Sequence, residues 1–320
     1  MSGLNLRMLP KVRDSWSFLY VERCRIDQED RAIALHDQSG TTPVPCASLN
    51  LLMLGPGTTI THAAVRSLAE SGTTILWTGE SGVRLYAQGL GETRSALRLL
   101  HQARLCSNPA LRLNVVRRMY AVRFPEPLAS DLTLRQIRGK EGIRVREAYA
   151  RASRETGVTW QGRAYRRDDW RAADPVNRAL SAANSCLYGI CHAAILAAGY
   201  SPGLGFIHTG KLLSFVYDIA DLYKADLTVP LAFQAARDND DGLETRVRRL
   251  CRDMFKEQRL LARIVDDIDR VLDIGDLPPA TELDEDAGAL GALWDPDAGE
   301  IASGVNYADL PDDELDGAEP

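Results

Sequence analysis

The sequence predicts an α+β protein: a small N-terminal β-rich dimerisation domain over residues 1–90, an all-α catalytic domain over residues 93–272, and an acidic flexible tail over residues 273–320. Three observations favour this division. Alternating apolar and polar residues are confined to the first ninety positions, long helical patterns follow them, and no Lys or Arg occurs after position 272. The total of 320 residues allows one large or two ordinary domains.

Two β-hairpins are predicted in the N-terminal part. Residues 15–37 alternate apolar and polar side chains around a polar DQED turn. Residues 73–89 place two β-rich runs around the Gly-containing turn GESG. Between them, Thr61 has the position of an N-cap, and the short helix after it ends at a glycine.

Helical periodicity dominates the rest of the body. Residues 95–124 read as helical, residues 131–157 as one long helix, residues 177–200 as a buried helix, and residues 245–272 as a helix pair. An aromatic and basic loop separates the second and third of these segments. We therefore expect the second domain to be entirely α-helical.

The net charge of −6 conceals an uneven distribution of charge. All 38 Lys and Arg lie in residues 1–272 with 29 of the 44 Asp and Glu, so the body carries +9 and the tail −15. A basic body is the electrostatic footprint of a polyanion-binding protein. The Pro- and Gly-containing acidic tail is typical of disorder, and it could bind a partner or mask the body itself.

The composition also indicates the cellular compartment of the protein. No apolar run reaches the length of a membrane span, and the N-terminus lacks the apolar core of a signal peptide. The six cysteines form no C-x-x-C pair and no metal-type spacing with histidine. We expect a cytoplasmic protein with reduced thiols and no membrane partner.

The stretch Gly203–Lys224 carries the most chemistry. A helix is predicted from Leu212, on which Asp218 and Asp221 are three residues apart and share one face. His208 lies just before this helix, and an imidazole with carboxylates suits a divalent metal of the Mg or Mn kind. The alternative is a loop, a capped helix and two solvated aspartates.

Two further motifs have competing interpretations. Glu141, within RGKEGIRVR, is either an exposed glutamate paired with neighbouring arginines or a third acidic ligand. Residues 205–211, GFIHTGK, match the start of a nucleotide-binding P-loop, but Leu212 replaces the required Ser or Thr and no strand precedes the motif. The tryptophans 160 and 170, interleaved with arginines, either stack on bases or pack inward.

Several long motifs of the sequence resemble those of a known protein family. GTTILWTGESGVRLYA, LRLNVVRRMY, RQIRGKEGIRVR, GVTWQGRAY, the run from SAANSCLYGIC to IADLYK, and VRRLCRDMF span about residues 15–270. In these segments the chain resembles the family of CRISPR-associated endonucleases that act as the first protein of the adaptation module. The resemblance is to the type I-E form of this family. The segment SFLYVERCRID differs in length from the family pattern, which leaves the role of Tyr20 as a duplex-splitting wedge open.

The resemblance implies roles for individual residues. Glu141, His208 and Asp221 would bind Mg2+ or Mn2+, and Asp218 would support them as an acidic neighbour in the catalytic site. Residues matched to positions that contact DNA or its 3′ end are Arg84, Arg138, Arg146, Arg163, Tyr165, Tyr188, Lys211, Tyr217 and Arg248.

The resemblance also implies a function and partners. The protein would be a metal-dependent endonuclease and integrase that inserts short foreign DNA into the CRISPR array, the 3′-OH ends attacking phosphodiesters of the leader–repeat. Its partners would be duplex DNA with single-stranded 3′ ends, a second copy of the chain, and a small ferredoxin-like adaptation protein in a four-plus-two complex. A non-catalytic DNA-binding subunit on the same fold and a P-loop nucleotide hydrolase are the alternatives.

Overall fold

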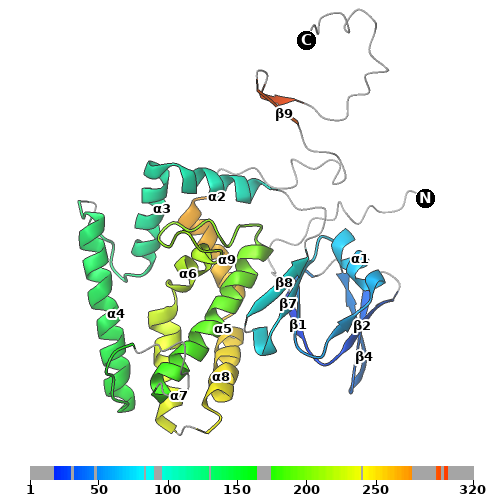
Figure 1. Ribbon diagram of the computed structural model, residues 1–320, viewed down its shortest axis with the longest axis horizontal. Helices are drawn as coiled ribbons and strands as arrows, with labels where there is room; N and C mark the ends of the chain where they lie inside the picture. Colours follow the sequence, from blue (N-terminus) through cyan, green and yellow to red (C-terminus); the bar gives the residue numbers. More distant parts are fainter. Residues whose placement is uncertain are drawn as a thin grey trace, which may run out of the picture. The chain divides into compact units, whose positions relative to one another are not determined.

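The computed structural model describes residues 18–29, 32–46, 49–82, 84–89, 96–129, 131–163, 174–238, 241–275, 293–296 and 299–301. The chain divides into two compact units, Met1–Pro278 and Pro279–Pro320. In the first unit strands come first and helices follow (Figure 1), which confirms the predicted fold class. The proposed boundary at residues 90–93 lies outside the described residues and stays a prediction.

The β region contains two four-stranded sheets. In order across the first sheet, the strands are β1 (Phe18–Val21), β5 (Leu51–Leu54), β7 (Thr74–Thr78) and β8 (Leu85–Gly89). In order across the second, they are β4 (Gly40–Pro45), β3 (Ala32–Asp37), β2 (Arg25–Glu29) and β6 (Thr59–Ile60). The pairs β2–β3 and β7–β8 are antiparallel, so both predicted hairpins are confirmed. Strand β1 lies outside the first hairpin and instead pairs in parallel with β5.

The central strands β5 and β7 of the first sheet are buried on both faces. Along β5, Leu52 and Leu54 enter the core of the β region, whereas Leu51 and Met53 enter the core shared with the helices. This alternation follows from the two-residue period of a strand, and a strand covered on both faces has to be apolar throughout. Helix α1 (His62–Glu70), which Thr61 caps as predicted, adds to the first of these cores.

Eight helices are described after the sheets. They are α2 (Leu97–Ser107), α3 (Pro109–Val122), α4 (Leu134–Thr156), α5 (Pro175–Ala197), α6 (Ser214–Ala220), α7 (Val229–Asp238), α8 (Leu243–Glu257) and α9 (Leu260–Leu272). The predicted helical segment 95–124 is divided, because the Asn108 side chain accepts bonds from two backbone amides and Pro109 begins a new helix. Helix α7 and the π-helical turn Lys224–Thr228 are not predicted by the sequence pattern.

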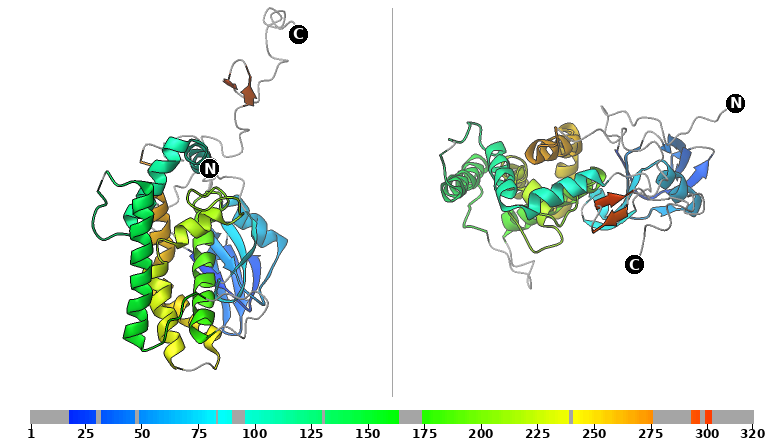
Figure 2. Two further views of the ribbon diagram at one scale, coloured as in Figure 1. Left: turned by 60° about the vertical axis from the view of Figure 1, so that its left-hand side comes forward. Right: turned by 90° about the horizontal axis from the view of Figure 1, so that it is seen from above.

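Helix α5 is the centre of the helical region (Figure 2). It packs against α6, α7, α8, α9 and β7. A Cβ atom at Gly189 would collide with the carbonyl oxygen of Gly82, so the close approach of α5 to the β7–β8 turn requires glycine. The helix is long and apolar enough to cross a membrane, but 61% of its most apolar window is buried inside the protein. Its apolar length is therefore accounted for by the core.

The second unit is described only at a short hairpin. Strand β9 (Leu293–Asp295) pairs antiparallel with β10 (Gly299–Ile301). The sequence pattern does not predict this hairpin. The other residues of the proposed flexible tail beyond Gly275 lie outside the described part of the chain.

Candidate metal and nucleic-acid site

The loop before α6 is organised by one buried carboxylate. Asp218 is 0% exposed, and its Oδ2 accepts bonds from the backbone amides of Phe206 (2.6 Å) and Ile207 (3.0 Å). Its Oδ1 accepts the His208 amide (2.8 Å) and lies 2.7 Å from His208 Nδ1. The loop can close this tightly because residue 205 is a glycine. A Cβ atom at this position would collide with the His208 carbonyl oxygen.

Asp218 also fixes the orientation and charge of His208. With Nδ1 held by the carboxylate, Nε2 is the nitrogen left to face a ligand. The hydrogen bond that His208 donates to Asp218 and the nearby charge of Asp221 raise the pKa of His208, against the lowering effect of its burial. His208 Nε2 lies 4.0 Å from Asp221 Oδ2, and the imidazole is 43% exposed. The loop therefore presents a nitrogen and a carboxylate together at the surface.

Asp218 and Asp221 both approach the imidazole of His208, so their three-residue spacing directs them to the same side chain. The alternative of two solvated aspartates is wrong for Asp218. Helix α6 ends at Ala220 with Asp221 as its C-cap, while the Asp218 side chain turns inward to the loop amides. These amides replace the water that the buried carboxylate loses.

Asp221 has a cationic partner in the same turn of chain. Its Oδ1 accepts a 2.6 Å bond from Lys224 Nζ, which also lies 4.8 Å from the ring centroid of Tyr188. Burial lowers the pKa of Lys224, but the charge of Asp221 and the Tyr188 contact outweigh it and raise the pKa. Tyr188 in turn meets Tyr217 edge to face at 5.1 Å. The half of the site that the loop provides is thus bordered by one lysine and two tyrosines.

Glu141 projects from α4 into a pair of arginines. Its Oε1 accepts from Arg123 Nη1 (3.2 Å) and Arg144 Nη2 (3.2 Å), and its Oε2 accepts from Arg144 Nε (3.0 Å). Its side chain is 12% exposed. The structure therefore contains the ion pairs of the first interpretation, in which Glu141 pairs with neighbouring arginines.

The structure brings together part of the predicted ligand set. His208, Asp218 and Asp221 are adjacent, whereas Glu141 bonds arginines. Among the described residues, no group of three or more His, Cys, Asp or Glu side chains is arranged to hold a metal. The donor chemistry of His208 Nε2 with a carboxylate nonetheless fits Mg2+ or Mn2+, and the Asp218–His208 bond is the usual outer support of a metal-binding histidine.

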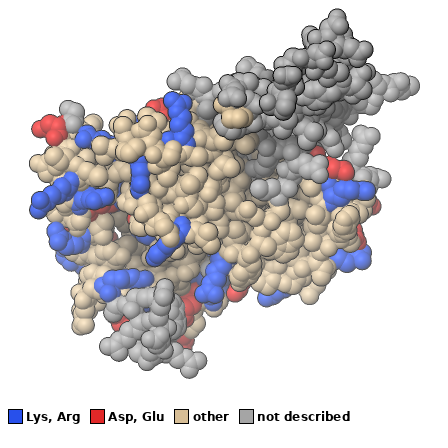
Figure 3. All heavy atoms as spheres, turned by 45° about the horizontal axis from the view of Figure 1, so that its top comes forward, with Lys and Arg blue, Asp and Glu red and all other residues tan. Residues whose placement is uncertain are grey.

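The proposed DNA contacts are distributed over several elements. Arg138 and Arg146 are exposed on α4, Lys211 is exposed beside His208, and Arg84 is exposed between β7 and β8. Lys and Arg side chains are spread over the helical part of the face in Figure 3. The structure therefore leaves these cations available to a polyanion.

The remaining proposed contacts differ in their surroundings. Arg163 is anchored on α5 through the Asn177 carbonyl oxygen (2.9 Å) and Ser181 Oγ (2.8 Å), and Arg248 lies half-buried within α8. Tyr165 lies outside the described residues. Trp160 stacks on Tyr149 with ring centroids 4.6 Å apart, which supports its inward-packing interpretation.

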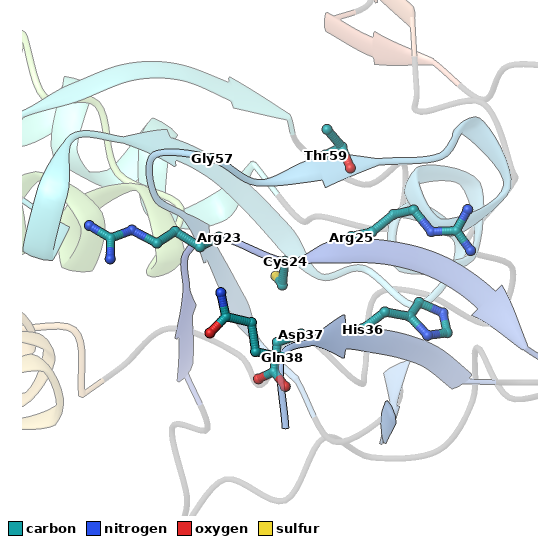
Figure 4. Close-up of a pocket in the computed structure, with 8 residues that line it drawn as sticks. All are labelled: Arg23, Cys24, Arg25, His36, Asp37, Gln38, Gly57 and Thr59. Atoms are coloured by element: carbon teal, nitrogen blue, oxygen red, sulfur yellow. The ribbon is translucent and has the colours of Figure 1, made fainter. Parts of the chain in front are cut away.

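A hollow with a volume of about 460 Å³ lies on the β region, away from the residues described above (Figure 4). Its lining includes Arg23, Arg25, His36 and Asp37. His36 lies 3.0 Å from Thr41 Oγ1 through Nδ1 and 3.5 Å from Asp27 through Nε2. The lining thus holds two arginines and a histidine with a single carboxylate.

Sequence reasoning missed two cations of the site, Arg123 and Lys224, whereas Arg144 is one of the arginines expected to pair with Glu141. The three-residue spacing of Asp221 and Lys224 signals their pairing in the sequence. Arg123 reaches Glu141 from the end of a different helix, which no local spacing reveals. The P-loop alternative also lacks support, since the segment before GFIHTGK is helix α5 and not a strand.

Comparison with known proteins now decides the family. The family model described as CRISPR associated protein Cas1 matches residues 18–125 and 123–246. The chain belongs to the Cas1 family. It is 56% identical over 319 residues to CRISPR-associated endonuclease Cas1 2 of Thermus thermophilus, covering 99% of this chain and 97% of that protein. It is 46% identical over 286 residues to CRISPR-associated endonuclease Cas1 of Escherichia coli, covering 89% and 93%.

A solved relative supports the Cas1 fold independently. The crystal structure of a TtCas1–DNA complex matches with a TM-score of 0.77 and 59% sequence identity, over 82% of this chain and 99% of that chain. The family resemblance inferred from the sequence motifs is thereby confirmed, and the type I-E form stays a prediction.

Proposed function

We propose that the chain is a metal-dependent DNA endonuclease and integrase of the type I-E adaptation module. The observation that carries this proposal is the preformed Asp218–His208 pair beside Asp221, in a chain 59% identical to a Cas1 solved with DNA. Lys211, three residues after His208 in the sequence, is exposed, which suits a site that receives a phosphodiester.

His208, Asp221 and Glu141 would hold Mg2+ or Mn2+, which when bound supplies charge stabilisation and activates the attacking oxygen. Asp218 keeps the imidazole of His208 oriented with Nε2 outward. Lys211 and Tyr217 would hold the DNA 3′ end, and Arg138 and Arg146 of α4 would bind the phosphate backbone. The reaction is the transfer of a phosphodiester bond to a 3′-OH, or to water in hydrolysis.

The partners follow from the same proposal. The DNA would be a duplex with single-stranded 3′ ends and the leader–repeat of the CRISPR array. A homodimer and a small ferredoxin-like partner in a four-plus-two complex would hold the two DNA ends, with the β-rich domain as the dimerising part. We place the protein in the cytoplasm.

A cleavage and integration assay with branched DNA tests the proposal. We expect turnover to require Mg2+ or Mn2+ and to stop on chelation. Glu141→Ala and His208→Ala should each lower it by more than about 100-fold, since outer supports of metal ligands alone account for about 10–100-fold. Arg66→Ala, at an exposed arginine on α1, is the control and should retain turnover.

The same assay separates the alternatives. A non-catalytic DNA-binding subunit would bind the branched DNA without any metal-dependent cleavage. Cleavage that persists in Glu141→Ala or His208→Ala would reject the site assignment. A nucleotide hydrolase would instead turn over ATP in a manner that depends on Lys211.

A further inference from the structure

The two arginines that hold Glu141 differ in their burial. The side chain of Arg123 is 4% exposed, whereas that of Arg144 is 17% exposed. Arg123 makes one bond to the carboxylate, and Arg144 binds both carboxylate oxygens through its Nε and Nη2 atoms. Glu141 therefore has one interior and one peripheral cationic partner.

Arg123 is built as a permanent partner. Its guanidinium lies 5.0 Å from the ring centroid of Tyr120, and its buried Nε and Nη2 atoms have no hydrogen-bond partner among the residues that the structure describes. A guanidinium in such surroundings is stable only while a carboxylate balances its charge. Arg123 therefore cannot be released from Glu141 without leaving a buried charge unpaired.

Arg144 is positioned so that it can exchange the Glu141 carboxylate for another anion. It lies on the same helix as Glu141, and its third nitrogen, Nη1, is 3.8 Å from Asp226, whose side chain is 62% exposed. A guanidinium fork matches a phosphate as well as it matches a carboxylate. The exposed cations Lys140 and Arg151, four residues before and seven residues after Arg144, lie on the same side of this helix and would bring a phosphate backbone close to it.

The Glu141 carboxylate is occupied as it stands. Both of its oxygens accept bonds from Arg144, and Oε1 also accepts a bond from Arg123. Removal of Arg144 would leave Oε1 bonded to Arg123 and would free Oε2 to bind a metal.

We propose that Arg144 is a DNA-contacting residue that exchanges Glu141 for a phosphate of the bound DNA, and that this exchange releases Glu141 to the metal. The inference rests on the proposed function, because it takes Glu141 to be a ligand. DNA and metal then raise each other's affinity by the same factor, since coupling between two binding equilibria is reciprocal.

Titration of Mn2+ by electron paramagnetic resonance tests the exchange without relying on turnover. The full chain is titrated alone and with a duplex whose single-stranded 3′ ends are dideoxy-terminated, so that no transfer occurs. For the unaltered chain, DNA should raise Mn2+ affinity about tenfold, within the usual range of coupling between sites. In Arg144→Gln, affinity without DNA should already be about tenfold higher, and DNA should add less than about twofold.

Two further variants serve as controls for this titration. Arg154→Gln, at an exposed arginine on the last turn of α4, should give the affinities of the unaltered chain. Arg144→Lys keeps the charge without the fork and should fall between the unaltered chain and Arg144→Gln, which keeps the test available if the glutamine variant does not fold. Mn2+ affinities in Arg144→Gln and Arg144→Lys equal to those of the unaltered chain, with and without DNA, would overturn the exchange.

Failure of the proposed function would look different. If His208→Asn and Glu141→Gln leave Mn2+ affinity unchanged in the presence of DNA, the metal site itself is wrong, and the exchange falls with it. If these two variants weaken Mn2+ binding while the Arg144 variants change nothing, the metal site stands and the exchange alone is rejected.

Discussion

The candidate site has two halves that are stabilised in different ways. In the loop half, Asp218 is held by three backbone amides and the His208 imidazole, so its geometry follows from the path of the chain. In the helix half, Glu141 is held by two arginine side chains. Backbone contacts can change only if the loop refolds, whereas ion pairs can exchange partners. The loop half is therefore preorganised, and the helix half is adjustable.

The largest expected effect is the loss of the buried carboxylate in the loop half. Asp218→Ala leaves three backbone amides without their acceptor and should lower the free energy of unfolding by about 3–5 kcal/mol. Asp226→Ala, at an exposed carboxylate, should cost less than about 0.5 kcal/mol. Chemical denaturation of both variants provides the measurement. Equal stabilities would show that the loop does not depend on Asp218.

The next effect separates the two arginines of the helix half. Arg123→Met should cost about 1–3 kcal/mol, because it removes the interior partner of Glu141, while Arg144→Met should cost less than about 1 kcal/mol. Thermal unfolding in metal-free buffer compares them. A larger loss in Arg144→Met would mean that the peripheral arginine is the structural one, which would remove the basis for its exchange.

A smaller effect concerns the salt dependence of DNA binding. Affinity should fall steeply with salt concentration, because arginines displace counterions from the phosphates. Arg138→Gln and Arg146→Gln should each reduce the slope of log affinity against log salt by about one. Arg66→Gln, on the β region, should leave the slope unchanged. A flat salt dependence in the unaltered chain would contradict a DNA surface along α4.

The smallest effect is a difference between two histidines. His208 beside Asp218 should titrate above its ordinary pKa of 6.5, whereas burial lowers the pKa of His192 in α5 to about 4. The contribution of His208 to stability is full below pH 6.5 and is lost as pH rises through its folded pKa. His192 acts oppositely, and stability falls as pH drops from 6.5 towards 4. Imidazole NMR titration in chelator measures both, and equal pKa values would contradict the two environments.

Local signals predicted most of the fold. Thr61 caps α1 as predicted, and the long helix α4 ends at Gly157, the last residue of the predicted segment. The division at Asn108 was also available, since Asn followed by Pro favours the start of a helix. Helix α7 and the π-helical turn before it were not predicted, because tertiary packing decides how this apolar run is arranged.

The site was predictable only in part. His208 and Asp221 share one short stretch, so their proximity follows from sequence spacing. The inward turn of Asp218 could not be predicted, because it depends on a loop that folds back to present its amides. The pairing of Arg123 with Glu141 joins two helices and depends on their packing alone.

Anomalous scattering from a crystal of the chain with Mn2+ and a forked duplex tests the central claim most directly. We predict a manganese peak bound by His208 Nε2, Asp221 and Glu141, with Arg144 turned to a DNA phosphate and Arg123 still on Glu141. A manganese ion bound elsewhere, with Glu141 still held by both arginines beside the bound DNA, would contradict the account.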